Sequence, residues 1–254
     1  MPNHSTMKTY LFCLSILAIT LLHSCSPVVY STTGHVVPLF RRQGEVTLSG
    51  GYSNTNDGQG FNVQAAGAIT PRWALLTSVY SMSDKSSDGW SGHGTYFEGG
   101  GGYFGSIGVS NTFIYETFAG VGFAGIRNDY QNSSLDVNFI KPFIQPSIGV
   151  SQKWLDVAIT PRFGVVSYTN HEIQTTDDNY RTAAENYFND QKTTFVFEPG
   201  MTIRIGAKNL KLQIQYNIST FSYHAENANS NANPTINNQY LGIGLHYLLS
   251  DRYK

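Results

Sequence analysis

Apolar and polar residues alternate with a period of two through most of the chain. Residues 44–53 place Val46, Leu48 and Tyr52 on one face and polar residues on the other. Residues 210–219 alternate Leu, Ile and Tyr with Lys, Gln and Asn in the same way. Successive side chains of a strand point to opposite faces, so this pattern predicts β-strands with one apolar and one polar face.

The pattern predicts an all-β protein of about ten strands, each of roughly 10 to 15 residues. A tilted strand needs about 9–11 residues to cross a membrane, whereas soluble strands commonly have about 5–6. The lengths therefore favour a transmembrane up-and-down antiparallel β-barrel. The predicted strands are 44–53, 61–70, 73–83, 95–104, 111–126, 138–151, 154–168, 193–206, 210–219 and 239–249.

The connections between these strands alternate between short and long. The short set comprises 71–72, 105–110, 152–153 and 207–209. The other set is mostly long and polar and comprises 54–59, 84–94, 127–137, 170–192 and 222–238. Outer-membrane barrels have short periplasmic turns and longer extracellular loops. An even strand count would place both chain ends on the periplasmic side, and counts of eight or twelve remain open.

The polar faces of the later strands carry charged residues. A soluble, lipocalin-like barrel would turn the apolar face inward, whereas a membrane barrel turns it toward lipid. An arginine on the lipid face costs about 2–4 kcal/mol at the midplane, but it can pair with a carboxylate inside a lumen. We interpret the polar face as the lumen. The predicted lumen network consists of Glu116, Lys141, Arg162, Glu198 and Arg204.

Four prolines fall on the apolar face of predicted strands. Each proline lacks the N–H group that a sheet ladder needs, so bulges or local breaks are expected near Pro142, Pro146, Pro161 and Pro199. Alternatively, residues 160–162 form a turn, which would change the strand count.

The amino end has the features of a secretory signal. Met7 and Lys8 precede an apolar run over residues 10–22, which is shorter than the about 20 residues of a spanning helix. The last residue of the run begins the sequence Leu22-His23-Ser24-Cys25, which resembles a bacterial lipoprotein signal. The resemblance implies a signal peptide over residues 1–24, lipidation of Cys25 and a lipid-anchored periplasmic tether over residues 25–43. The alternatives are an ordinary cleaved signal or an uncleaved anchor.

The last predicted strand is glycine-rich and ends in alternating apolar residues. Gly242, Leu245 and Tyr247 resemble the closing-strand signal that the barrel-insertion machinery recognises, although Leu248–Lys254 follow it. Taken together, the chain resembles the small outer-membrane β-barrel lipoproteins of Gram-negative bacteria, with the barrel over residues 44–254. The resemblance implies the cell outer membrane as location and outer-membrane lipid as a partner. Acidic residues are absent just after Cys25, which favours an anchor in the periplasmic leaflet.

Composition narrows the chemistry. The net charge is −1 and only 13% of the 254 residues are charged, so nothing indicates nucleic-acid binding. Of two cysteines, Cys13 lies in the signal and Cys25 is the lipid site, which leaves no disulfide. Residues 120–125 match the dinucleotide-binding glycine pattern, but no helix follows them, so no cofactor is expected. The histidines fall on different segments and predict no metal site.

The segment 170–192 holds the one helical pattern. Asp177 or Asp178 can cap it, and Tyr180, Tyr187 and Phe188 fall on one face. These aromatics either pack against the barrel rim or form a lid that contacts an extracellular or membrane-protein partner.

The expected function is a structural or surface-interaction role for a barrel with a plugged or narrow lumen. The alternatives are a narrow pore or conduit for small amphipathic molecules and a hydrolase at the rim. Aspartates and histidines could gather at the rim, but no spacing selects a nucleophile–base pair, so an enzyme is not expected.

Overall fold

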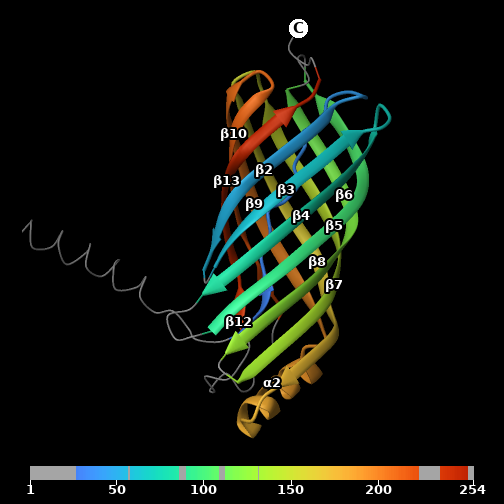
Figure 1. Ribbon diagram of the computed structural model, residues 1–254. Coiled ribbons are helices and arrows are strands. Elements are labelled where there is room, and N and C mark those ends of the chain that lie inside the picture. The colour runs from blue at the N-terminus through green and yellow to red at the C-terminus, as the bar shows by residue number, and fades with distance from the viewer. Residues whose placement is uncertain are drawn as a thin grey trace, which may run out of the picture.

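Ten antiparallel strands close into one barrel. The computed structural model describes residues 27–56, 58–85, 90–108, 112–130, 132–222 and 235–250. β13 pairs with both β10 and β2, which closes the barrel (Figure 1). The predicted fold class is thus confirmed. The barrel strands are β2 (Val46–Thr55), β3 (Gln59–Ala68), β4 (Trp73–Lys85), β5 (Trp90–Ile107), β6 (Phe113–Tyr130), β7 (Ser133–Ser151), β8 (Leu155–Gln174), β9 (Thr193–Ala207), β10 (Leu210–Ile218) and β13 (Gln239–Leu248).

Short elements complete the fold at one end of the barrel. There, β11 (Thr220–Phe221) extends the pairing with β9, and β12 (Thr235–Asn237) pairs in parallel with β1 (Val28–Ser31). Helix α2 (Asp178–Asp190) lies beyond the end of β8 (Figure 1). We call this the long-loop end, and the end with the β3–β4, β5–β6, β7–β8 and β9–β10 turns the short-turn end. No helix within the described ranges is both long and apolar enough to cross a membrane.

The barrel wall is much taller on one side than on the other. β5, β6, β7 and β8 have 18 to 20 residues, whereas β2, β3, β10 and β13 have 9 or 10. The expected loop 127–137 is wrong, because β6 and β7 stay paired up to Tyr130 and Ser133. The expected loop 84–94 likewise overlaps β4 and β5. Above the membrane both faces of a strand can be polar, so the period-two signal fades there although the pairing continues.

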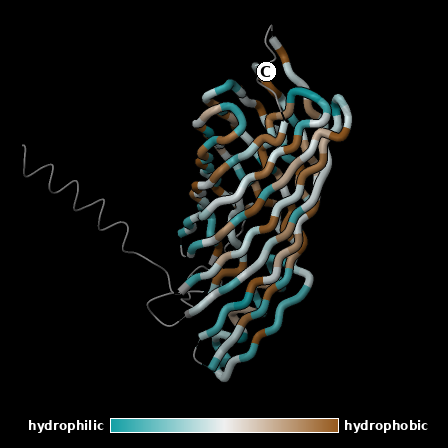
Figure 2. The backbone as a smooth tube through the Cα atoms, turned by 45° about the horizontal axis from the view of Figure 1, so that its top comes forward, coloured by the Kyte–Doolittle hydropathy of each residue, from teal (hydrophilic) through white to brown (hydrophobic). Residues whose placement is uncertain are grey.

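The exterior of the barrel is an apolar band. Leu75, Ile159 and Leu212 are 53%, 60% and 47% exposed on three strands around the barrel. Figure 2 shows hydrophobic and hydrophilic residues alternating along the strands. Trp73 and Tyr103 pack edge to face near the short-turn end, where interfacial aromatics are typical. The soluble alternative, with the apolar face inward, is therefore wrong.

The prolines are accommodated within the strands. Pro161 pairs with Pro199 between β8 and β9, so the alternative turn at residues 160–162 is wrong. The four prolines are exposed or partly exposed, as expected for the outward face. The β7–β8 ladder shifts register between Asn138 and Phe139, and its pairing is interrupted around Pro142.

The N-terminal segment fills the lumen. Every residue from 27 to 40 is buried, and the segment enters β2 after Gly44, whose N–H donates to the carbonyl of Ala68 (2.9 Å). We call residues 27–44 the plug. The structure differs here from the expected tether over residues 25–43, of which 25 and 26 lie outside the described ranges. The segment is buried because it carries apolar residues. Val28, Val36 and Phe40 pack within buried clusters.

Candidate functional site

Side chains of the barrel wall hold the main chain of the plug. Each carbonyl concerned accepts from an amide or guanidinium on β7, β9 or β10, so an extended backbone without sheet partners is satisfied inside the lumen. The bonds are Asn217 Nδ2 to Thr33 O (2.7 Å), Gln215 Nε2 to His35 O (2.7 Å), Gln145 Nε2 to Val36 O (2.8 Å) and Arg204 Nη2 to Val37 O (2.5 Å).

Glycine lets the plug pass its tightest neighbours. A Cβ atom at Gly34 would lie 2.6 Å from Asn62 Nδ2, 2.7 Å from the Tyr240 hydroxyl and 2.9 Å from Gln215 Oε1. Asn62 and Tyr240 also hydrogen-bond each other. The wall side chains therefore converge on the plug at this residue.

A buried ion pair crosses the lumen beside the plug. The Arg162 guanidinium donates to Glu98 at 2.9 and 3.1 Å and to Gln145 Oε1 at 2.9 and 2.6 Å. The side chains of Arg162 and Glu98 have no exposed surface, and the guanidinium lies 4.4 Å from the Phe143 ring centroid. This two-pronged geometry is the strong form of an arginine–carboxylate contact.

A second buried pair includes the plug itself. Lys141 Nζ donates to Glu198 at 3.0 Å and to the Tyr30 hydroxyl at 2.9 Å. That hydroxyl donates to Glu198 at 2.6 Å, and Ser219 Oγ donates to the same carboxylate at 2.8 Å. Tyr30 thus ties the plug into the charge network of the wall.

All five predicted lumen residues are buried. Only Lys141 and Glu198 form an ion pair with each other, and the other three bind groups outside the predicted set. Glu116 accepts from the N–H of Phe40 in the plug at 2.7 Å. Arg204 binds Gln213 Oε1 at 2.7 Å besides the plug. The partner of Arg162 is Glu98, which sequence reasoning missed. Its position was readable, because Glu98 alternates with the apolar Phe97 within the predicted strand 95–104.

The remaining predicted residues lie apart from this network. Gly242, Leu245 and Tyr247 are on β13, with Leu245 and Tyr247 exposed on the outer face. Tyr180, Tyr187 and Phe188 form the buried face of α2. Cys25 lies outside the described residues.

Helix α2 packs on the rim through its aromatic face. The Asp177 carboxylate accepts from the N–H groups of Asn179 (2.9 Å) and Tyr180 (3.3 Å) and caps the helix. The Phe188 ring stacks on His171 with centroids 4.5 Å apart. Burial raises the pKa of Tyr180 to about 12, so this phenol is neutral at physiological pH. The aromatic face matches the packing alternative.

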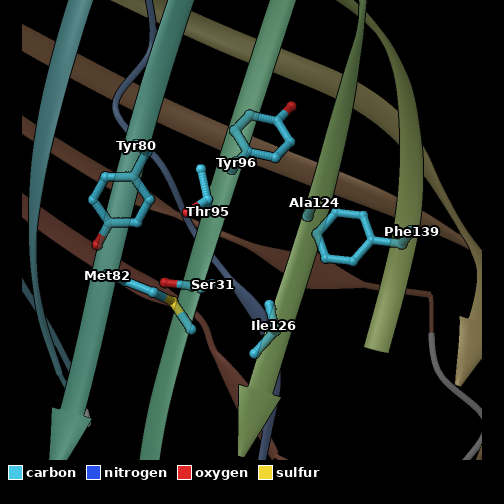
Figure 3. A pocket seen from close by; sticks show the side chains of 9 residues that line it. Ser31, Tyr80, Met82, Thr95, Tyr96, Ala124, Ile126 and Phe139 are labelled. Atoms are coloured by element: carbon cyan, nitrogen blue, oxygen red, sulfur yellow. The ribbon is translucent and has the colours of Figure 1, made fainter. Parts of the chain in front are cut away.

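Two hollows mark the upper lumen and the rim. The first, about 10 Å³, lies between Ser31 of the plug and wall residues such as Tyr80 and Tyr96 (Figure 3). It has room for about one water molecule, so plug and wall fill the lumen at this level. The second is an open cleft of about 390 Å³ at the long-loop end. It is lined by Tyr187, Ile218, Ser219, Thr220, Phe221, Ile236 and Asn238.

Two of the aspartates and histidines expected at the rim make structural contacts, and two others lie outside the described ranges. Asp177 caps α2 and His171 stacks on Phe188. Asp88 and His224 are among the residues not described. Within the described part of the chain, no group of three or more His, Cys, Asp or Glu could hold a metal ion.

Comparisons with known proteins return barrels of solved structure. Ail, the attachment invasion locus protein of Yersinia pestis, has 11% identity, a TM-score of 0.36 and coverage of 82% of this chain and 99% of its own. LpxR from Salmonella typhimurium has 8% identity, a TM-score of 0.37 and coverage of 79% and 99%. The translocator domain of autotransporter NalP from Neisseria meningitidis has 10% identity, a TM-score of 0.40 and coverage of 96% and 95%.

No protein-family model matches the chain, and no curated protein sequence matches it. The architecture rests on the strands themselves: a closed ten-stranded antiparallel barrel with an apolar exterior and a polar interior. This is a transmembrane barrel of the outer-membrane type.

Proposed function

We propose that the protein is a lipid-anchored outer-membrane barrel with a closed lumen, which acts without catalysis through contacts at its long-loop end. The observation that carries this proposal is the burial of every residue from 27 to 40 within the barrel. Eight-stranded barrels are just filled by their own side chains, so ten strands leave only a narrow space. The plug and its hydrogen bonds occupy that space.

Conductance in planar lipid bilayers tests the closed lumen. The full barrel should show no steady channel, because the plug fills the space that the Arg162–Glu98 and Lys141–Glu198 pairs leave in the lumen. A variant that lacks residues 27–43 serves as the open reference, with its folding checked by heat-modifiable gel migration. Steady conductance by the intact protein would instead support the narrow-pore alternative.

The lipid anchor is proposed at Cys25. In the lipoprotein reaction the cysteine sulfur displaces the phosphoglycerol headgroup of a phosphatidylglycerol donor and forms a thioether to its diacylglycerol. Water then cleaves the Ser24–Cys25 peptide bond, and the freed amine takes a fatty acyl group from a phospholipid ester, whose lysophospholipid leaves. Cells fed an alkyne-bearing fatty acid should label the protein, and Cys25→Ser should abolish the label. An equally labelled Cys25→Ser protein would contradict the anchor.

Surface contacts are proposed at the long-loop end, where the tall wall and α2 rise beside the 390 Å³ cleft. The cleft offers apolar rings next to hydroxyl and amide groups, a composition suited to protein contact. A photo-crosslinking residue at Thr220 should give products in intact cells that the same residue at Lys208, in the β9–β10 turn, does not. Deletion of residues 180–188 should remove those products. Identical products from both positions would contradict the contact role.

The absence of catalysis is also a proposal. It is supported by the structural use of Asp177 as a helix cap and of His171 as a stacking partner. Purified protein should hydrolyse neither peptide nor acyl-ester substrates. An activity that His171→Ala abolishes would overturn this part of the proposal.

A further inference from the structure

The plug runs through the barrel in one direction, and its two ends can be placed. At its start, Val28 exchanges two hydrogen bonds with the Asn128 side chain (3.0 and 2.9 Å), near the end of β6. β1 also pairs with β12 in the long β10–β13 connection, and the Thr32 N–H donates to the carbonyl of Asn237 (2.9 Å). The start of the plug therefore lies at the long-loop end.

The other end of the plug lies at the short-turn end. The Arg41 guanidinium donates to the carbonyl of Ser151, the last residue of β7. The Arg41 N–H donates to Glu45 at 2.8 Å, and Gly44 binds Ala68 next to the β3–β4 turn. Short turns mark the periplasmic side of an outer-membrane barrel, so this end faces the periplasm and the start of the plug faces the outside.

We infer that the mature N-terminus emerges on the cell surface, so that the acyl chains on Cys25 lie in the outer leaflet. Cys25 is two residues before Pro27, and two residues span at most about 7 Å. The short-turn end is out of reach, because the residues after Pro27 already occupy the path along the lumen and only two residues link Cys25 to the start of the plug. This assignment reverses the periplasmic anchor expected from the sequence. The leaflet rests on the lipid anchor proposed above, whereas the threading direction does not.

Slippage of the plug would not rescue a periplasmic anchor. To bring Cys25 to the short-turn end, the whole segment would have to leave the lumen. The carbonyls of Thr33, His35 and Val37 would lose their wall donors, and Glu198 would lose the Tyr30 hydroxyl. The wall groups left behind are buried, and unpaired buried polar groups are strongly unfavourable.

Single cysteines at the two ends of the plug test the threading. Cys13 lies in the signal and Cys25 is acylated, so the mature wild-type chain should present no free thiol and gives the background. Ser26→Cys precedes the plug, and Arg42→Cys replaces an exposed side chain at its other end. A membrane-impermeant maleimide should label Ser26→Cys at least tenfold more than Arg42→Cys in intact cells. Permeabilisation of the outer membrane should make the labelling equal.

A cleavage site joins the threading to the lipid. A protease recognition sequence between Ser26 and Pro27 should be cut by external protease in intact cells, and the alkyne label should then leave the barrel band. The same sequence after Lys208 should be cut only after permeabilisation. Heat-modifiable migration shows which variants have folded.

The outcomes separate the two proposals. An accessible site without alkyne label means that the anchor fails and the threading stands. A labelled protein whose Ser26–Pro27 site and Ser26→Cys thiol react only after permeabilisation overturns the inference and leaves the anchor intact.

Discussion

Arg162 has no exposed surface, and its charge is balanced by Glu98 and by the amide oxygen of Gln145. Removal of one member of a buried pair leaves an uncompensated charge and typically costs about 3–5 kcal/mol, whereas joint replacement by apolar residues is often neutral. Arg162→Met should therefore lower the unfolding free energy in lipid vesicles by about 3–5 kcal/mol. Arg162→Met combined with Glu98→Leu should recover most of that loss.

The exposed Arg127–Asp129 pair on β6 supplies the control for this prediction. Arg127→Met should change the unfolding free energy by no more than about 1 kcal/mol, because solvent screens an exposed pair. Urea titration followed by tryptophan fluorescence measures all of these variants. Equal stability of the Arg162 single variant and the double variant would contradict the pairing.

Gly34 allows a second residue-scale prediction. In Gly34→Ala the new methyl would force Asn62, Tyr240 or Gln215 to move, and Gln215 would lose its bond to His35. Overpacking of this kind costs about 1–3 kcal/mol. Gly67→Ala is the matched control, because its Cβ would lie 3.8 Å from Val46 Cγ2, an ordinary contact. The urea midpoint of Gly34→Ala should be lower than that of Gly67→Ala. Similar midpoints would mean that the lumen has room for a methyl group at residue 34.

At the scale of elements, α2 depends on its cap and its aromatic face. Asp177→Ala removes the acceptor for two helix N–H groups, which costs about 0.5–2 kcal/mol. The loss should appear as faster hydrogen exchange within residues 178–190, with the barrel strands unchanged, because the helix contacts the barrel mainly through β8. Asp178→Ala is the control, since that side chain is 92% exposed. Faster exchange in β8 as well would show that α2 and the wall unfold together.

The strands within the membrane were predictable because lipid and lumen impose opposite requirements on alternate residues. The pattern of residues 210–219 therefore predicted all of β10. The upper parts of β6 and β7 were missed, since Arg127–Asp129 and their neighbours lie beyond the lipid and need no apolar face. Their continuation is set by cross-strand pairing, which a single sequence does not display.

The plug shows the same limit for the site. The lumen charges could be placed by parity, because every buried charge on these strands needs a partner. Nothing in local alternation indicates that residues 27–40 are the partner of Gln145, Gln215 and Asn217. One signal of burial was present in the sequence, because an exposed tether would not carry six apolar residues. These are Val28, Val29, Val36, Val37, Leu39 and Phe40. The Arg162–Glu98 pair itself depends on closure of the barrel, which brings β8 and β5 near each other across the lumen.

For the whole molecule, the unequal wall sets the position of the lipid. Strands of 9 or 10 residues on the low side are just long enough to cross a membrane, so the membrane must coincide with β2, β3, β10 and β13. β5–β8 then rise beyond it on the extracellular side and support α2. The start of the plug lies at the same end, so a surface anchor, α2 and the cleft would share one face of the cell.

Two substitutions on the outer face of β4 test this position of the membrane. Val79 is 45% exposed on the outer face, halfway between Trp73 and Lys85, and pairs with Val63 and Phe97. Ser83 is exposed on the same face, two residues before β4 ends at the long-loop end. It pairs with Gln59 and His93. Val79→Arg should cost about 2–4 kcal/mol of unfolding free energy in vesicles, and Ser83→Arg about 0–1 kcal/mol, because the penalty falls from the midplane to the interface. Equal costs at the two positions would show that the membrane midplane does not lie at Val79, so the membrane would not coincide with the short strands.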